Sequence, residues 1–475
     1  MHQPIEIPEN RNKDFWLKGL CLRLVRSIYS LKTLELLMIL GFLVAWIVWP
    51  LRGTIAARNF ALVVGAISSI SWILIFQAKF KIQDLIPIIL LMFVPIWLLV
   101  LYIDFPRAPA LQWDDLSGTW LRVVIGSFFA IGLGKLYIHR PQYRRYFWWV
   151  LFIWPIIVFM IFLMQGIFTD SWSGETFYIH IFKSKVAGLY FLAWSLIFCF
   201  STFHYHSLTL NKFSIKKSIY VLVLFLLCIV DFVLLQSLNG FIAIIACFSM
   251  TIIFLIRDKP KLKFMGFFIK TILFIVAIIY FITATVLYNT KGGSGKLINL
   301  KADIRFILSE DATGAWKWDK SYDGAYPPIN PVTGNNVNGS TYERVTWFQE
   351  GIKILIDNPL GLGYTGQAFA GYMSERYPGS RATKTHSGWL DFGLGVGFPG
   401  LFAIWLALGV IFFQSRHSFY VDPHLQLTQA FIFWAILIMN LLWLIAEFSD
   451  REYIEHFFFV VTFFSIVSAS YKVDR

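Results

Sequence analysis

Three side chains whose types suit acid–base and anion chemistry follow one another in the last third of the chain: Arg344, His386 and Asp391. A neutral histidine can take a proton from a hydroxyl near neutral pH. An arginine presents a planar fork of N–H donors to an anion such as a phosphate. A nearby carboxylate can orient the imidazole and stabilise its charged form. The three types together predict a site that activates a hydroxyl beside a bound anion.

The arginine falls at the start of a predicted helix. Ser340-Thr-Tyr-Glu343 has the spacing of a capping box, and Val345, Phe348, Ile352 and Leu355 then recur every three or four residues. We expect an amphipathic helix over 341–357, ended by Asn358-Pro359. Free N–H groups and the helix dipole favour an anion near Arg344. The structural alternative is a solvated Arg344, or one paired with Glu343 or Asp357.

The histidine follows a glycine-containing turn and precedes an apolar run. The turn reads Asp357-Asn-Pro-Leu-Gly-Leu-Gly-Tyr364, and glycines there allow close approach of backbone segments. His386 is then followed by Ser-Gly-Trp-Leu-Asp391 and by several glycines. This order predicts His386 at a membrane surface, with Asp391 about a turn and a half deeper. The structural alternative is a histidine that only anchors the chain at the interface.

The composition is that of a chain whose main solvent is lipid. Of 475 residues, 57% are hydrophobic, 15% are charged and 18% are aromatic, whereas soluble domains carry more charge. The formal charge of +13 comes from short basic clusters between apolar runs, which indicates membrane topology and not nucleic-acid binding. The four cysteines offer neither a disulfide framework nor zinc-ligand spacing.

Apolar runs long enough to cross a bilayer predict an all-α polytopic membrane protein with about twelve transmembrane helices. The runs lie near 34–50, 59–78, 85–103, 118–137, 147–168, 187–207, 218–237, 240–256, 264–288, 387–413, 426–447 and 454–471. Lys and Arg concentrate in alternate connections, which by the positive-inside rule are cytoplasmic. Both termini are therefore expected inside.

This topology divides the chain into five parts. Residues 1–33 form a cytoplasmic segment that reads as part of an uncleaved anchor, and residues 34–288 hold helices one to nine. Residues 289–385 form the one large outer loop, 386–471 hold helices ten to twelve, and 472–475 are a cytoplasmic tail. The predicted site residues Arg344 and His386 fall in the outer loop and at its end.

Three successive elements resemble the O-antigen ligase and polymerase superfamily of bacterial envelope glycan enzymes. They are Tyr342-Glu-Arg344 opening a helix that ends at Asn358-Pro-Leu-Gly-Leu-Gly363, then His386 with Leu390-Asp391, then Gly397-Phe-Pro-Gly400-Leu. The family pattern has Asn where this chain has Ser387 and Glu where it has Asp391. The motifs cover about residues 340–401, and the helix layout with one large outer loop fits over the whole chain.

The resemblance implies a GT-C-like, metal-independent glycosyltransferase of the bacterial inner membrane with no cofactor. Its ligase members move a glycan from an undecaprenyl-diphosphate carrier to a sugar hydroxyl of the lipid A core, on the periplasmic face. Carried onto this sequence, His386 would be the base that deprotonates the acceptor and Arg344 would hold the diphosphate leaving group. Cations that neutralise the leaving group can replace a metal.

One position departs from the family pattern. The family carries a second arginine in a turn near the middle of the chain, where this sequence has Asn239 within Gln236-Ser-Leu-Asn-Gly240. Asn239 can donate a hydrogen bond but carries no charge. Arg305, Lys296 and Arg381 are candidates to supply the positive charge that Asn239 lacks. Otherwise this chain binds its glycan donor differently from the family. Lys384, next to the histidine, is a further candidate for substrate binding.

Other polar residues have two readings each. Asp231 lies inside the seventh predicted span, where a carboxylate is costly and so is presumed functional, near the carrier lipid or as a partner of a neighbouring helix. Glu447, Asp450, Arg451 and Glu452 cluster in the last outer turn, where they line the mouth of the site or form a solvated turn.

Alternative functions remain at this stage. An O-antigen polymerase or a protein O-oligosaccharyltransferase needs the same base and cations as the ligase. A lipid-linked glycan transporter or flippase belongs to another class and predicts charged or broken helices at the bilayer midplane, for which only Asp231 fits. An inert scaffold leaves the His386 and Arg344 elements without a purpose.

Overall fold

The structure is a computed structural model that describes residues 30–169, 184–209, 215–235, 242–247, 300–309 and 327–469, with residues 182, 249 and 317 singly. Within these ranges the chain is helical, with two isolated bridges and no β-strand. The helices of the first part are α2 (Leu31–Val48), α3 (Ile55–Phe76), α4 (Ile82–Asp104), α5 (Pro109–Asp115), η1 (Leu116–Trp120), α6 (Leu121–His139), η2 (Pro141–Tyr143), α7 (Arg144–Thr169), α8 (Lys185–Thr209) and α9 (Ile215–Leu234). Those of the second part are α12 (Leu300–Ser309), α13 (Gly339–Asp357), α14 (Ala368–Arg376), α15 (Gly388–Val421), α16 (Gln426–Ile445) and α17 (Arg451–Ser468).

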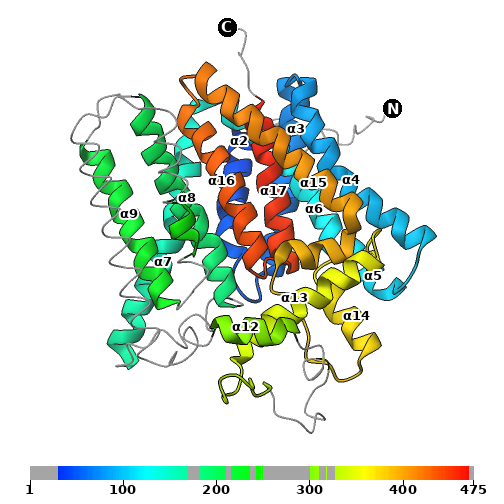
Figure 1. Ribbon diagram of the computed structural model, residues 1–475. Coiled ribbons are helices and arrows are strands. Elements are labelled where there is room, and N and C mark those ends of the chain that lie inside the picture. Colours follow the sequence, from blue (N-terminus) through cyan, green and yellow to red (C-terminus); the bar gives the residue numbers. More distant parts are fainter. Residues whose placement is uncertain are drawn as a thin grey trace, which may run out of the picture.

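The long helices form a bundle with two different ends. The short helices α5, α12, α13 and α14 gather at one end, which we call the loop end (Figure 1). We call the opposite end, where α2 begins and α17 ends, the far end. α17 lies in the middle of the bundle and packs against α6, α4, α15 and α16. Its side chains from Tyr453 to Val461 are all buried, so α17 is the central core helix.

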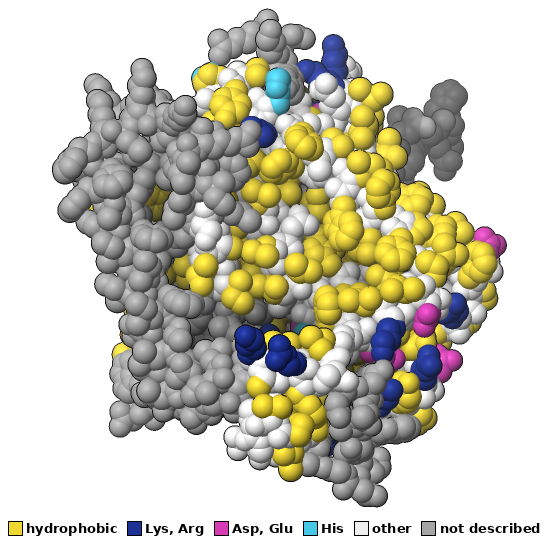
Figure 2. Space-filling model, viewed as in Figure 1, with side chains coloured by type: hydrophobic (Ala, Val, Ile, Leu, Met, Phe, Trp, Pro, Cys, Tyr) yellow, Lys and Arg dark blue, Asp and Glu magenta, His cyan; other side chains and the backbone are white. Residues whose placement is uncertain are grey.

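The protein is an all-α polytopic membrane protein. Among the described residues, eight helices are long and apolar enough to span a bilayer, with α5, η1 and α6 forming one continuous span. Apolar side chains form a broad band around the visible face, and charged side chains collect toward the loop end (Figure 2). Ten predicted spans coincide with described helices, α9 and α17 among them. The predicted spans 240–256 and 264–288 fall almost wholly outside the described residues, so the count of twelve stays a prediction.

α15 contains a break that another part of the chain repairs. Gly397 has φ 67° and ψ −174°, outside the helical region. Pro399 has no N–H, so the carbonyl of Gly395, four residues earlier, loses its helical partner. The N–H of Gly363 donates to that carbonyl at 2.9 Å, and the N–H of Leu362 donates to the carbonyl of Leu394 at 2.8 Å. The predicted glycine turn thus supplies hydrogen bonds that lipid cannot.

Glycine is required on both sides of this joint. A Cβ on Gly361 would lie 2.5 Å from the carbonyl oxygen of Gly395, and one on Gly397 would lie 2.2 Å from the carbonyl carbon of Leu360. Trp97 of α4 completes the joint by donating from Nε1 to the carbonyl of Leu360 at 3.2 Å. The turn and the break therefore fix the start of α15 against the end of α13.

The predicted amphipathic helix is α13, and its end at Asp357 agrees with the sequence expectation. Its start differs. Asn338 is the N-cap, with its side-chain oxygen accepting the N–H of Thr341 at 3.2 Å, so the helix begins at Gly339 and not after Ser340. Asparagine is among the best N-cap residues, which explains why the helix begins two residues earlier than the capping-box spacing predicts.

Candidate active site

His386 lies in the last residues before α15 with an uncommon backbone conformation. Its φ is +63°, a region that non-glycine residues rarely adopt and that costs about 1–3 kcal/mol. Ser387 caps α15 by accepting the N–H of Leu390 on its hydroxyl. The turn at His386 lets the helix begin directly afterwards while the imidazole points back toward α13.

Two side chains fix the imidazole ring. Nδ1 of His386 is hydrogen-bonded to Oε1 of Glu447, in the connection between α16 and α17. The ring also stacks on Trp347 of α13, with centroids 5.2 Å apart and an angle of 1° between the planes. Nε2 is buried and has no hydrogen-bond partner among the described residues. With Nδ1–H donating to Glu447, Nε2 is the nitrogen that can accept a proton.

Glu447 remains charged in this surrounding. Burial alone would raise the pKa of Glu447, but the hydrogen bond from His386 and the charges of His386, Lys384 and Arg344 hold that pKa below its ordinary value. The carboxylate is therefore ionised at neutral pH. It orients the ring and stabilises an imidazolium whenever His386 takes a proton.

Arg344 lies beside this pair at the start of α13. It is three residues before Trp347, so both side chains lie on neighbouring parts of one helix face, and its charge acts on Glu447. Arg344 is exposed, and no described residue pairs with its side chain. The alternative of a salt bridge to Glu343 or Asp357 is not observed. Its N–H donors are free to bind an anion beside His386.

The predicted role of Asp391 differs from its observed contacts. Its Oδ1 accepts the N–H of Thr385 at 2.7 Å, and its Oδ2 accepts the hydroxyl of Ser449 at 3.0 Å. Asp391 is buried at the start of α15 and does not hold the imidazole, because Glu447 occupies that position. Asp391 instead holds Thr385, the residue before His386, and Ser449, in the connection after α16. It therefore helps to position the site without touching the imidazole.

Lys384 is also held at this site. Nζ of Lys384 lies 2.7 Å from Oδ1 of Asp450. Burial would lower the pKa of Lys384, but Asp450, with smaller effects of Glu447 and Asp391, raises it above its ordinary value. The lysine is therefore a permanent cation next to His386. The connection between α16 and α17 contacts His386, Asp391 and Lys384 in succession, through Glu447, Ser449 and Asp450.

The other predicted binding residues are more widely spread. Arg305 is exposed on α12 and Arg381 is exposed on the loop that leads to His386. Asp231 is fully buried in α9, with neither carboxylate oxygen hydrogen-bonded to a described residue, and α9 packs against α7 and α8. Asn239 and Lys296 lie outside the described residues. The structure thus brings His386, Arg344, Asp391 and Lys384 together, and leaves Asp231 on another part of the bundle.

Sequence reasoning missed Trp347 and gave Glu447 only a place at the mouth. Trp347 lies within the predicted amphipathic helix, and its position three residues after Arg344 was a usable signal. Glu447 is 61 residues away from His386 along the chain, and no local spacing connects the two.

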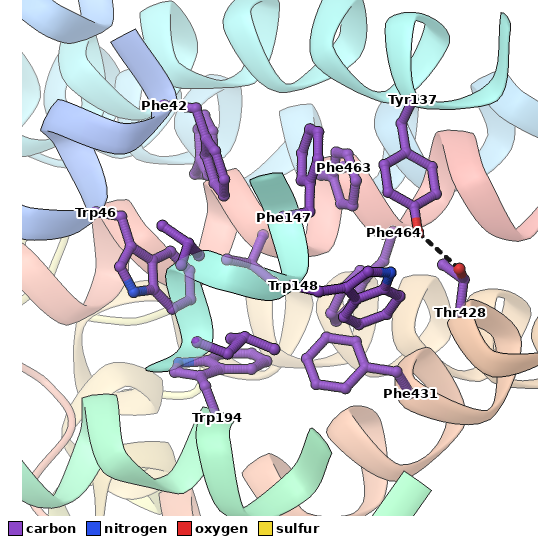
Figure 3. A pocket seen from close by; sticks show the side chains of 14 residues that line it. Phe42, Trp46, Tyr137, Phe147, Trp148, Trp194, Thr428, Phe431, Phe463 and Phe464 are labelled. Atoms are coloured by element: carbon purple, nitrogen blue, oxygen red, sulfur yellow. Dashed lines mark hydrogen bonds between the residues drawn. The ribbon is translucent and has the colours of Figure 1, made fainter. Parts of the chain in front are cut away.

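The bundle also contains an aromatic cavity of about 50 Å³ (Figure 3). Its walls come from α2, α6, α7, α8, α16 and α17, and none of the site residues above lines it. One polar contact borders it, the hydroxyl pair of Tyr137 and Thr428 at 2.7 Å. Its size and dry lining suit a packing void between helices, so it is not the reaction site.

The fold and the site define a multi-pass membrane protein with a carboxylate-oriented histidine and an exposed arginine beside it at one end. Residues 223–406 match the family model of O-antigen ligase, and this segment contains Arg344, His386, Asp391 and the glycine joint. Over this segment the chain is similar to the O-antigen ligase superfamily. No curated protein matches the chain.

Proposed function

We propose that this protein is a glycosyltransferase of the ligase type in the bacterial inner membrane. It moves a glycan from an undecaprenyl-diphosphate carrier to a sugar hydroxyl of the lipid A core. The observation that carries this proposal is the imidazole of His386, held at Nδ1 by Glu447 and unpartnered at Nε2. It lies beside the free guanidinium of Arg344, within a segment that matches O-antigen ligase.

His386 acts as the general base. Nε2 takes the proton of the acceptor hydroxyl as its oxygen attacks the anomeric carbon of the donor, and Glu447 stabilises the resulting imidazolium. Stacking on Trp347 keeps the ring from rotating. Since Nε2 is covered in this structure, the acceptor reaches it when neighbouring side chains move aside, which is common for sites without substrate.

Arg344 acts on the leaving group. The bond between the anomeric carbon and the diphosphate oxygen breaks, and negative charge develops on the diphosphate. A guanidinium stabilises that charge through two parallel N–H···O bonds. Lys384 adds positive charge on the same side, and Arg305 and Arg381 are the cations that would extend the binding surface. The proposed reaction needs no metal, and transfer that continues in the presence of a chelator would support this.

The loop end is the periplasmic face in this proposal. That face is where the carrier presents its glycan, and the positive-inside pattern puts both termini in the cytoplasm. Residues 289–385 then form the periplasmic loop domain between helices nine and ten. The donor arrives from the bilayer and the acceptor from the outer side of the membrane, so a base at the membrane surface can contact both.

Analysis of envelope glycans in a deletion strain tests the proposal. We expect a core without attached polymer and an accumulation of polymer on the lipid carrier. Single repeat units on the carrier, without polymer, would instead identify an O-antigen polymerase. Loss of glycan from proteins with a normal lipopolysaccharide ladder would identify a protein O-oligosaccharyltransferase. An unchanged envelope would contradict the proposal.

A further inference from the structure

Three arginines converge at the loop end, apart from the residues of the candidate active site. Arg58 lies in the first turn of α3, Arg122 at the start of α6 and Arg451 at the start of α17. We call them the arginine cluster. Arg58 and Arg122 belong to helices long and apolar enough to span the membrane, where an ionisable side chain is costly and marks function by default.

The two inner arginines share one carboxylate. Nε of Arg122 lies 2.6 Å from Oε1 of Glu455, and Nε of Arg58 lies 3.3 Å from Oε2. The side chains of Arg58 and Glu455 are only 4% and 1% exposed. The contact of Arg58 lacks hydrogen-bond geometry, and its Nε has no hydrogen-bond partner among the described residues. One carboxylate thus faces two buried or half-buried guanidiniums.

Most of the N–H donors of the cluster are unused. An arginine carries five N–H donors. The terminal nitrogens of Arg58 and Arg122 form no hydrogen bond with a described residue, and Arg451 uses one terminal nitrogen to bind Asp114. Asp115 and Glu452 also act on Arg451; Oδ2 of Asp115 accepts from Thr365, and its Oδ1 is buried with no hydrogen-bond partner among the described residues. A purely structural ion pair would satisfy these donors, because leaving a buried charge unpaired is strongly destabilising.

Gly118, in the π-helical turn η1, lies against two of the arginines. The position of a Cβ on Gly118 lies 3.5 Å from Nη1 of Arg451 and 3.8 Å from Nη2 of Arg122. The absence of a side chain at Gly118 therefore leaves both guanidiniums open on that side. Single π-helical turns occur often at functional sites.

The helix ends near the cluster also favour negative charge. The N-caps of α3 and α17, Thr54 and Asp450, form no side-chain cap hydrogen bond. The first two N–H groups of both helices therefore keep their partial positive charge for another acceptor. Arginine donors, uncapped helix starts and an open glycine all point to one class of ligand, a tetrahedral oxyanion with several acceptor oxygens.

We propose that the arginine cluster binds the phosphoryl group of a membrane lipid. Arg122 and Arg58 contact its oxygens, Arg451 lies at the entrance, and Glu455 holds the two inner arginines in place when no lipid is bound. Arg58 and Arg122 lie in the first turns of helical segments within candidate membrane spans, which suits a phosphate whose chain stays in the bilayer. This site differs from the candidate active site and does not depend on the transfer reaction at His386.

Lipid binding to the purified full-length protein in detergent tests this site. The probes are undecaprenyl phosphate and phosphatidylglycerol, with undecaprenol as the uncharged reference, and native mass spectrometry counts the bound lipid. We expect Arg122→Gln to weaken binding of a phosphorylated probe roughly tenfold, since charge-assisted hydrogen bonds are lost. Glu455→Gln should tighten it, because the competing carboxylate is gone. Undecaprenol binding should not change.

Controls separate this site from a structural ion pair and from the active site. Arg140→Gln, which removes an arginine paired with Glu35 at the far end, should leave binding unchanged, and so should His386→Ala. Arg451→Gln changes a partly exposed side chain and serves as the mild test if Arg122→Gln folds poorly. A loss confined to undecaprenyl phosphate identifies the carrier lipid, and a loss for both probes identifies a general lipid phosphate site.

Equal binding by the wild type, Arg451→Gln and Glu455→Gln would overturn the proposal. So would a Glu455→Gln variant that binds more weakly and melts at a lower temperature, because that is the behaviour of a carboxylate needed only to hold the helices together.

Discussion

The two ends of the helix bundle treat their charges differently. At the far end, Glu35 is buried and accepts hydrogen bonds from Trp72, Arg140 and Tyr143, and Lys135 pairs with Asp84 and the carbonyl of Lys79. At the loop end, Nε2 of His386 and Nε of Arg58 are buried without a hydrogen-bond partner among the described residues.

Paired charges stabilise a bundle, whereas unpaired polar atoms cost free energy unless a ligand satisfies them. The paired charges of Glu35 and Lys135 therefore suit a structural role, whereas the unpartnered nitrogens of His386 and Arg58 suit ligand binding. The predictions below test this division, from the largest expected effect on transfer to the smallest.

The largest effect is expected from His386→Ala. Removing a general base lowers the rate roughly 10²- to 10⁴-fold, which would abolish visible attachment of glycan in cells. Gels of lipopolysaccharide measure the attachment, and immunoblots of membranes measure the amount of inserted protein. A wild-type ladder from a normally inserted His386→Ala variant would show that this histidine is not the base.

Arg344 should come next. Arg344→Ala removes a donor to the developing charge of the leaving group, with an expected loss of roughly 10²- to 10³-fold in the rate of transfer. Arg344→Lys should restore only part of the rate, because a point charge lacks the bidentate fork.

Arg376→Ala is the matched control for Arg344→Ala, since Arg376 is an exposed arginine on α14 that donates a hydrogen bond to the hydroxyl of Tyr372. It should transfer glycan as the wild type does. Full rescue by Arg344→Lys, or equal losses in both alanine variants, would mean that Arg344 provides only general positive charge.

Glu447→Gln should have an intermediate effect. Replacing a residue that orients a functional histidine costs roughly tenfold to a hundredfold. It also changes the pH dependence of stability. Because the pKa of Glu447 in the folded state lies below its ordinary value of 4.5, the ionised carboxylate stabilises the fold above that pH. This stabilisation is lost as the pH falls through the lowered pKa.

Thermal unfolding of the wild type and Glu447→Gln in detergent measures this effect. We expect a lower melting temperature for the variant at pH 7 and a gap that shrinks below about pH 4.5. A gap that is constant from pH 7 to pH 3 would show that Glu447 is not the charged partner of His386.

Glycine substitutions test the joint that positions the site. Gly397→Ala places a Cβ 2.2 Å from the backbone of Leu360 at a positive φ, so we expect a loss of stability of at least about 2 kcal/mol. Gly409→Ala, in the same helix, has no atom within 4 Å of its new Cβ and should be neutral. The melting temperatures of the two variants measure this difference. Equal melting temperatures would show that the close contact between Gly397 and Leu360 does not stabilise the fold.

The smallest effect on transfer is expected at the far end. Glu35→Gln leaves Arg140 without its carboxylate, and it should reduce stability by about 1–3 kcal/mol. Transfer per folded molecule should match that of the wild type in assays normalised to inserted protein. A specific loss of transfer in this variant would break the division between the two ends.

The sequence predicted features that depend on local spacing or on total apolarity. Apolar runs gave most of the long helices, and the helix stop at Asn358-Pro359 coincides with the end of α13. The sequence did not predict the start of α13, because Asn338 and Ser340 are both good N-cap residues and only packing selects between them. It also ended the tenth span at 413, whereas α15 continues to Val421.

The contacts within the site were harder to foresee. Sequence spacing predicted that Asp391 orients His386, because the two are close in the chain. In the structure Asp391 accepts hydrogen bonds from Thr385 and Ser449 instead. Glu447 reaches His386 from the next helix connection, and Glu455 joins Arg58 from the opposite end of the chain. Such pairs follow from how helices pack in three dimensions, which periodicity along one chain does not record.

Transfer by the purified protein in proteoliposomes tests the central claim most directly. The vesicles contain an undecaprenyl-diphosphate-linked glycan and a lipid A core acceptor, and the measurement is the amount of glycan joined to the core. The wild type should form this product, His386→Ala should not, and Arg376→Ala should match the wild type. Product formation by His386→Ala at the wild-type rate, or no product from the wild type with both substrates present, would contradict the account.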